Sequence, residues 1–305
     1  MKKNYFILGI GLFLFSCGGN EEATEETTND DNTTEETTEE VVESGAIDPF
    51  PDFPKDKLNA AAGDIVLSPS KNWQEDATKD GAENTTFIFY KQTLAEPGDQ
   101  YSKVDFMGDK GVEIPNYMIV PIKPNQTAKK GDILLTWWQS GSGMKRAIVT
   151  DDSDPAAPVV NYIDIDWDNP AQNSEGVGFG QMTEQIEAGT FHVLTSTWAP
   201  GTTVAAKADG KVKAATVIAV SGDKVLTIGF AGKMAVYPKA DCTPVPVKPN
   251  VKAGDAVQAP WVGSFVNTKV VKVDAAMGRV WCEDPYSDDP MVIPFGDVAT
   301  GLSVE

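Results

Sequence analysis

The fold is decided by the stretch KAGDAVQAPWVGSFVNTKVVKV, which covers residues 252–273. Gly254 opens a Gly-Asp turn, because glycine adopts backbone conformations that other residues avoid. After this turn, Val257 and Ala259 stand two positions apart and therefore share one face of a strand. A second run of alternating residues passes through Val270 and ends at a further turn. The stretch therefore predicts two neighbouring β-strands.

The beginning of this stretch recurs along the chain as four ungapped octets that start with glycine. They read GDIVLSPS at 63–70, GDILLTWW at 131–138, GTTVAAKA at 201–208 and GDAVQAPW at 254–261. The fourth position is apolar and the sixth is small, so both point to the same side of a strand. These residues are Val66, Leu134, Val204 and Val257, and then Ser68, Thr136, Ala206 and Ala259. A second strand follows each octet, which makes the pattern an internal repeat.

Short strands at this pitch, with little helix between them, predict an all-β protein of tandem small five-stranded barrels. The barrel units are expected at 47–125, 126–197, 198–248 and 249–305. A modest helix is expected at 181–188 and an inserted loop at 71–85. About fifty residues per unit is too few for a large sandwich and fits a strongly bent small barrel.

The strands and turns of the fourth unit carry a wider pattern. It consists of Gly254-Asp255, Val257, Ala259, Trp261, Val270-Val271, Val280 and PFGDV at 294–298. In this pattern the unit resembles a Tudor-type barrel, which shares its fold with the Src-homology-3-like barrels. The second unit is similar over Gly131-Asp132, Trp138 and 147–149. The resemblance implies a Tudor-like fold for the repeated unit.

Tudor readers hold a methylated lysine or arginine in a cage of four aromatic positions by cation–π attraction. In the fourth unit Trp261 matches the first position and Tyr286 the last, while Val266 and a position near Asp284 are not aromatic. In the second unit Lys145 stands at an aromatic position and would repel a cationic guest. The resemblance therefore implies the fold and leaves the ligand open.

The N-terminal segment MKKNYFILGIGLFLFSC, residues 1–17, has a basic start, a short apolar run and a final cysteine. The apolar run is too short for a comfortable membrane span. The last four residues resemble a bacterial lipobox, which implies cleavage before Cys17 and attachment of a diacylglycerol to its thiol. The alternative is an ordinary secretory signal with an incidental cysteine. We expect a signal peptide followed by a lipid-anchored cysteine.

Residues 18–46 carry eleven carboxylates and no lysine or arginine. This Thr- and Glu-rich segment has no apolar period, so we predict a disordered acidic linker that holds the folded part off the membrane. Acidic residues so close to a lipidated cysteine resemble the surface-export signal of Bacteroidetes lipoproteins. The resemblance implies an outer-membrane lipoprotein of the cell envelope that is exposed at the surface.

The charge of the remaining chain excludes one class of partner. Removing the linker carboxylates and two N-terminal lysines leaves 34 acidic and 23 basic residues, a net charge of −11 over 47–305. Such a body repels phosphates at long range. We therefore predict no nucleic-acid partner, and expect the membrane and a protein, peptidoglycan or glycan as partners.

Four aromatic residues are the candidate ligand-binding residues: Trp137, Trp138, Trp261 and Tyr286. Flat exposed rings can stack on a sugar or a peptide. The alternative is that the tryptophans close the ends of the barrels as core residues. Because neighbouring residues of a strand point to opposite faces, Trp137 and Trp138 cannot both face the core of one sheet.

The segment 164–175 places carboxylates at the first, third, fifth and twelfth positions of a calcium-binding hand loop. These residues are Asp164, Asp166, Asp168 and Glu175. The sixth position is Asn169 instead of glycine, and the preceding segment is a strand. We therefore interpret the aspartates as lying on the solvent-exposed face of that strand. We predict neither a metal site nor a cofactor.

The remaining reactive side chains do not form a catalytic pattern. His192 is the only histidine and stands in an alternating stretch, so we interpret it as structural. Cys242 and Cys282 are interpreted as buried thiols, and a disulfide between them is the alternative outside the cytoplasm. We expect no enzyme and no catalytic residue.

The favoured function is therefore a binding or adhesion role for a peptide, wall polymer, glycan or partner protein. One alternative is a structural or assembly lipoprotein that docks to an envelope complex through barrel edges. Another is a carboxylate-dependent hydrolase. Exposed aromatics beside a groove favour the first, a wide apolar face between units the second, and converging carboxyls with one raised pKa the third.

Overall fold

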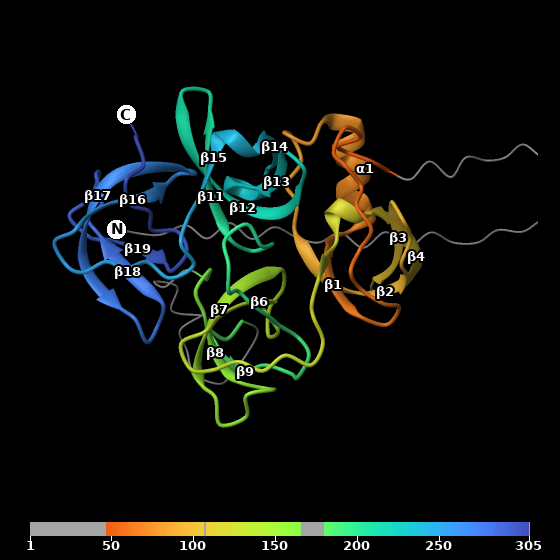
Figure 1. Ribbon diagram of the computed structural model, residues 1–305, viewed down its shortest axis with the longest axis horizontal. Helices are drawn as coiled ribbons and strands as arrows, with labels where there is room; N and C mark the ends of the chain where they lie inside the picture. The colour runs from red at the N-terminus through yellow and green to blue at the C-terminus, as the bar shows by residue number, and fades with distance from the viewer. Residues whose placement is uncertain (1–46, 107, 166–179, 305) are drawn as a thin grey trace, which may run out of the picture. The chain divides into compact units, whose positions relative to one another are not determined.

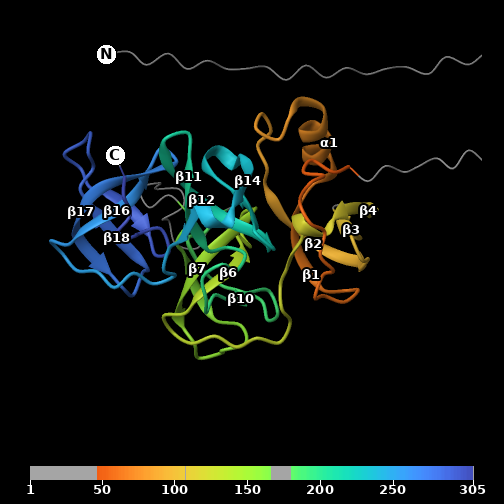
Figure 2. The ribbon, with the colours of Figure 1, turned by 45° about the horizontal axis from the view of Figure 1, so that its top comes forward.

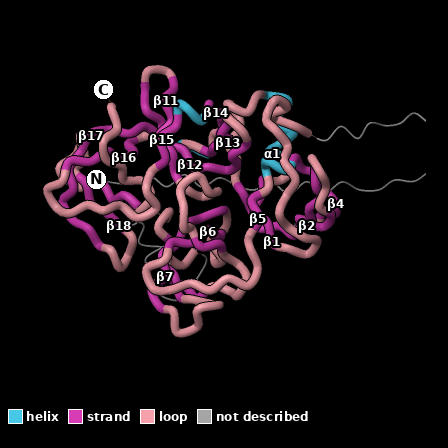
Figure 3. The backbone as a smooth tube through the Cα atoms, in the orientation of Figure 1, coloured by secondary structure: helices cyan, strands magenta, loops and turns pink. Residues whose placement is uncertain are grey.

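Short antiparallel strands dominate the computed structural model of the chain, which describes residues 47–106, 108–165 and 180–304. Figure 3 shows strands throughout, with helix confined to α1 and to brief single turns. The described residues belong to one unit, 45–305. The expectation of an all-β fold built from several small antiparallel sheets is confirmed.

Three sheets contain the strands, and Figures 1 and 2 show them in successive colours along the chain. The first holds β1 (Ile65–Pro69), β2 (Phe89–Glu96), β3 (Tyr101–Phe106), β4 (Asp109–Pro115) and β5 (Val120–Pro121). The second holds β6 (Ile133–Trp137), β7 (Met144–Asp151), β8 (Val159–Tyr162), β9 (Thr183–Gln185) and β10 (His192–Val193). The third begins with β11 (Thr203–Ala208), β12 (Lys211–Ser221), β13 (Lys224–Ile228), β14 (Met234–Pro238) and β15 (Cys242–Pro244). It continues with β16 (Ala256–Trp261), β17 (Ser264–Asp274), β18 (Arg279–Cys282) and β19 (Met291–Pro294).

The strand order repeats along the chain. The first sheet runs β4-β3-β2-β1-β5, the second runs β9-β8-β7-β6-β10, and the first half of the third runs β14-β13-β12-β11-β15. The last four strands run β19-β18-β17-β16, and a single bridge from Gln258 to Ala299 extends that order. Within the described ranges these pairings leave each sheet open, so closed Tudor-like barrels remain a prediction.

One turn begins each of the four groups, and it explains the glycine at the head of each octet. The φ angles are +91° at Gly63, +85° at Gly131, +87° at Gly201 and +92° at Gly254. Each of these glycines donates its N–H to a carbonyl of the following strand, namely that of Leu94, Val149, Val217 or Val270. The register of that strand shifts directly after each acceptor. Only glycine takes this φ without strain, so the turn selects the residue.

The residues at the fourth and sixth positions of the octets are all buried, with exposed fractions of 0–1%. The period of two therefore predicted the inward face correctly. The largest apolar cluster combines side chains from all four groups, including Val66, Ile133, Leu226 and Val257. The small sheets consequently share one packed interior, which sets the geometry of the junctions between them.

The expected positions of helix and loop were wrong. Residues 181–188 contain strand β9, whereas α1 (Lys71–Asp80) occupies the segment expected to be a loop. Met182 and Ile186 are both buried, and a spacing of four fits one face of a strand as well as one face of a helix. In α1, Gln74 and Ala77 face inward, and the N–H of Gly81 returns to the carbonyl of Ala77.

The segment before β1 is fastened to the first sheet. Asp48 accepts hydrogen bonds from the hydroxyls of Tyr101 and Tyr117 and pairs with Lys55 at 2.8 Å. Phe53 is buried in the largest cluster. Burial alone would raise the pKa of the Asp48 carboxyl, but the Lys55 and tyrosine contacts outweigh it and lower that pKa. The chain therefore enters the fold at a fixed place.

Candidate functional site

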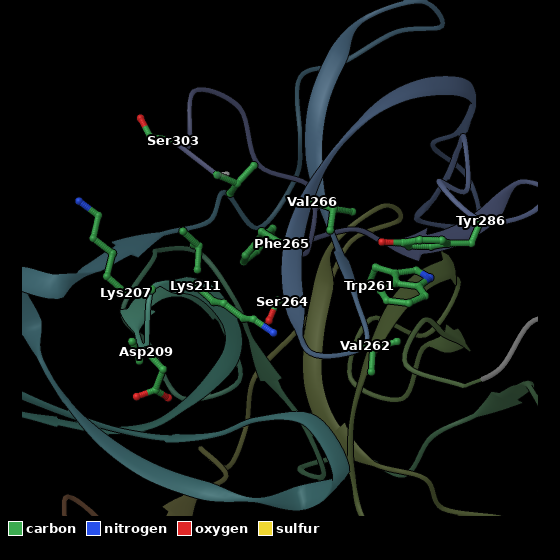
Figure 4. Close-up of a pocket in the computed structure, with 14 residues that line it drawn as sticks. Lys207, Asp209, Lys211, Trp261, Val262, Ser264, Phe265, Val266, Tyr286 and Ser303 are labelled. Carbon is green, nitrogen blue, oxygen red and sulfur yellow. The ribbon is translucent and has the colours of Figure 1, made fainter.

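A groove of about 600 Å³ lies between the two halves of the third sheet. One wall is the β11–β12 hairpin with Lys207, Asp209 and Lys211, and the other is the β16–β17 hairpin together with Tyr286. Figure 4 shows Trp261 and Tyr286 on one side of the groove and the hairpin with Lys207 on the other. The groove is therefore a composite of the third and fourth expected units.

Trp261 and Tyr286 form an aromatic pair at this groove. Their ring centroids lie 4.2 Å apart with an interplanar angle of 35°, and the Tyr286 side chain is 71% exposed. Trp261 ends β16, and the two-residue turn at Val262 and Gly263 has φ angles of +44° and +77°. The N–H of Tyr286 donates to Asp284 Oδ1 at 2.8 Å, which shapes the loop that carries its ring.

The aromatic pair is not a cage for a methylated cation. Because the two rings contact each other, no guest can sit between them. Val266 lines the same groove, and it adds no ring. The lysines on the opposite wall would in addition repel a cationic ligand.

The opposite wall is locally basic. Its turn is made by Asp209 and Gly210, with φ angles of +52° and +70°. Lys213 lies 4.0 Å from Asp209, whereas Lys207 and Lys211 make no ion pair with any described residue. In Figure 4 the Lys211 side chain extends toward Ser264, across the groove. Three lysines and one aspartate give the hairpin 207–213 a charge of +2 in a chain of net charge −20.

Phe265 forms the floor of the groove and belongs to an apolar core that the two halves share. Ala205 and Val245 from one half pack with Phe265 and Ala299 from the other, and all four are buried. The backbone N–H of Ala214 donates to the carbonyl of Gly263 at 3.0 Å. The two walls are therefore held at a fixed separation.

The structure places Trp138 away from this groove. Its Nε1 donates to the carbonyl of Gln181 at 2.7 Å. Its ring packs against Gly141 and Gly180, where an added Cβ would lie 2.3 Å and 2.6 Å from ring atoms. The Trp138 ring also lies edge-on to Tyr162, with centroids 6.5 Å apart. This packing matches the alternative of a structural tryptophan.

Trp137 lies at a second groove, of about 380 Å³, between the first and second sheets. Lys91 Nζ is 5.7 Å from the centre of its ring. Tyr90 and Phe106 line the same groove with ring centroids 5.5 Å apart, and they also border a hollow that contains Trp73. Sequence analysis missed these three aromatics, although Tyr90 follows the buried Phe89 and must therefore point to the outer face.

Asp164 is engaged in a buried ion pair. Arg146 Nη2 lies 2.7 Å from Asp164 Oδ1 and 2.9 Å from Asp297 Oδ2, and Arg146 Nη1 contacts Thr203 Oγ1 at 3.3 Å. Asp166, Asp168 and Glu175 lie outside the described residues. The interpretation of Asp164 as a residue of the solvent-exposed face was therefore wrong, because its carboxylate pairs with the Arg146 guanidinium at the junction between sheets. Among the described residues, no three His, Cys, Asp or Glu side chains gather to hold a metal.

The other reactive side chains have structural surroundings. His192 Nδ1 lies 3.1 Å from Gln126 Nε2, and burial, with a smaller effect of Lys123, lowers the pKa of the imidazole. Cys242 and Cys282 are buried free thiols. Burial raises the pKa of each thiol to about 11. Both cysteines are thus poor nucleophiles at neutral pH.

Comparisons of the sequence with protein-family models and with curated proteins find no match. No helix within the described ranges is long and apolar enough to cross a bilayer. The fold and the two grooves therefore carry the functional argument.

Proposed function

We propose that this protein is a non-enzymatic binding lipoprotein of the cell envelope that holds a glycan chain in the groove beside Trp261 and Tyr286. The observation that carries the proposal is the pair of contacting, mutually tilted rings on the wall of an open groove, of which Tyr286 is exposed and Trp261 partly buried. Exposed aromatics beside a groove are the feature expected of a binding module.

The exposure of the rings favours a glycan over a peptide. Side-chain anchors of peptides and small ligands usually occupy pockets that enclose most of their surface. Tyr286 instead presents an open face, and Ser264 and Ser303 line the groove as polar neighbours. A sugar ring needs only a flat aromatic face together with hydrogen-bonding groups around it.

The two carboxyls at the junction between sheets support a role without catalysis. Asp164 and Asp297 converge, but Arg146 lies between them and bonds to both. Burial alone would raise the pKa of Asp164, yet the charge and hydrogen bonds of Arg146 lower it overall. A glycosidase acid requires a raised pKa. The contacts of Asp164 and Asp297 with Arg146 are better explained as stabilising the junction between the sheets.

The proposed tether is the N-terminal segment, with lipid on Cys17 and the acidic linker 18–46 as a spacer. Its support is the signal-like sequence before Cys17. The fixed entry point at Asp48 would then place the folded part at the end of the linker. We propose the outer membrane as its site, with the groove available to glycans outside the cell.

A second candidate is assembly of an envelope complex through an exposed apolar surface. Phe230 and Val262 are 61% and 60% exposed. A Cβ built on Gly263 would lie 2.5 Å from Phe230 Cβ, so Phe230 rests against the turn that contains Val262. This patch borders the groove and could contact a protein that carries or receives the glycan.

A glycan array probed with the full-length protein tests the proposal. The comparison is the wild type against Trp261→Ala, with Trp198→Ala as a control at a partly buried tryptophan outside the groove. We expect the wild type and Trp198→Ala to bind the same glycans and Trp261→Ala to lose them. Equal binding by all three folded proteins would remove the site from this groove, and capture of peptides alone would overturn the glycan assignment.

A further inference from the structure

We infer that the glycan bound in this groove is anionic and that Lys207 and Lys211 bind its acidic groups. The inference rests on the proposed function, because it takes the ring pair of Trp261 and Tyr286 as the stacking platform. It adds that the ligand is negatively charged. One wall then supplies the rings that stack on the sugar, and the other supplies the lysines that bind the acidic groups.

The first argument is that the hairpin 207–213 is positively charged, whereas the chain as a whole is negatively charged. Residues 47–305 have a net charge of −11, so the folded part as a whole repels anions. The hairpin 207–213 carries +2, and it faces a groove. This cationic wall attracts negative groups on its own side of the groove, opposite the acidic loop 283–289 that carries Tyr286, and charges farther than about 8 Å are screened at physiological salt.

The second argument is that these two ammonium groups are available. Some lysines of the described part are held by carboxylates, such as Lys55 by Asp48 at 2.8 Å and Lys103 by Glu96 at 2.8 Å. Lys207 and Lys211 make no such pair there, although Asp209 stands in the turn between them. Asp209 is instead nearest to Lys213. Carboxylate, sulfate or phosphate groups of a ligand can therefore pair with both lysines without displacing an internal partner.

The third argument is that the site needs both halves of the third sheet. The rings belong to the fourth expected unit and the lysines to the third, and the bond between Ala214 and Gly263 joins the two hairpins. Because Phe265 and Ala205 pack beneath them, the rings and the ammonium groups keep a fixed separation. The groove therefore suits a polymer whose sugar ring stacks on Tyr286 while its acidic groups lie at the wall that carries Lys207 and Lys211.

Three matched pairs of polymers test the charge requirement with the full-length protein. Each pair has one backbone in acidic and in neutral form: polygalacturonate and its methyl ester, alginate and its propylene glycol ester, and carboxymethylcellulose and hydroxyethylcellulose. Dissociation constants are measured for the wild type, Lys207→Gln/Lys211→Gln and Lys252→Gln/Lys269→Gln. The last variant removes the same charge from exposed lysines outside the groove.

We expect at least one acidic polymer to bind at least tenfold more tightly than its neutral form. Lys207→Gln/Lys211→Gln should weaken that binding by about 5- to 30-fold, as two partly exposed ion pairs would. Lys252→Gln/Lys269→Gln should stay within about twofold. Equal affinity for acidic and neutral forms, unaffected by the lysine changes, would overturn the inference and leave the glycan proposal intact.

Two further results separate the inference from its foundation. Loss of all polymer binding in Trp261→Ala supports the proposed function whatever the lysines do. If no polymer of either kind binds, both proposals fail. Lysine-dependent binding to vesicles that contain anionic lipid, without binding to any polymer, would assign the basic wall to a membrane surface instead and would also overturn the inference.

Discussion

Replacing Arg146 by methionine is expected to lower the free energy of unfolding by about 3 kcal/mol. The Arg146 side chain is 6% exposed, and its guanidinium bonds to Asp164 and Asp297, which are 24% and 19% exposed. Removing one partner of a buried ion pair costs about 3–5 kcal/mol, because the opposite charge is left buried without a partner. The partial exposure of both carboxylates places the expected loss at the low end of that range.

The pH dependence of the free energy of unfolding should differ in direction between the wild type and Arg146→Met. In the wild type the pKa of Asp164 is below its ordinary value, so its contribution to stability is complete above the unfolded pKa of about 3.9 and is lost as the pH falls through the folded pKa. Without Arg146, the charge and hydrogen bonds that oppose the effect of burial are lost, and burial raises the pKa of Asp164. Arg146→Met should therefore become more stable as the pH falls from about 7 to 5, whereas the wild type should not.

Urea unfolding at both pH values, followed by tryptophan fluorescence, measures the two effects. Arg146→Lys is the control, because it keeps the charge and loses the paired geometry of the guanidinium, so its loss should be intermediate. A loss below about 1 kcal/mol in Arg146→Met, with an unchanged pH profile, would show that the junction does not depend on this ion pair.

Smaller perturbations test other parts of the fold. Gly254→Ala should lower the free energy of unfolding by about 1 kcal/mol because φ is +92°, and thermal melting should show Gly229→Ala, at φ −110°, to be nearly neutral. In Cys17→Ala, a thiol reagent should find Cys242 and Cys282 only after denaturation, since both are buried; rapid reaction of the native protein would contradict that placement. The same variant should leave the membrane fraction and lose labelled fatty acid, and a retained label would refute the anchor.

Local patterns explain which parts of the fold were predictable. The glycine turn and the period of two depend on residues close together in sequence, so the inward faces of the four octets were visible in the chain. The segment at 181–188 shows the limit of such patterns. Met182 and Ile186 satisfy both a helical and a strand period, and pairing with β8 decides between them.

Long-range juxtapositions explain what was missed. Trp261 and Tyr286 were singled out because their residue type suits stacking, but nothing local connects them with Lys207, more than fifty positions away. Arg146 and Asp297 are 151 residues apart. One signal was available: the chain has only two arginines, Arg146 and Arg279, and both are buried at junctions between sheets. Their planar guanidinium suits buried pairing better than lysine does.

The stability of the junction and the geometry of the groove depend on the same few residues. A single group of five short strands cannot enclose a deep pocket, so a binding site in this chain has to form between groups of strands, as the groove between the two halves of the third sheet does. Asp297, which pairs with Arg146, stands two residues before Ala299, and Ala299 exchanges backbone hydrogen bonds with Gln258 and packs in the floor of the groove. Loss of the ion pair should therefore displace the floor of the groove through residues 297–299. Arg146→Met is expected to weaken glycan binding although Arg146 does not line the groove, and restoring the charge with lysine should recover part of that binding.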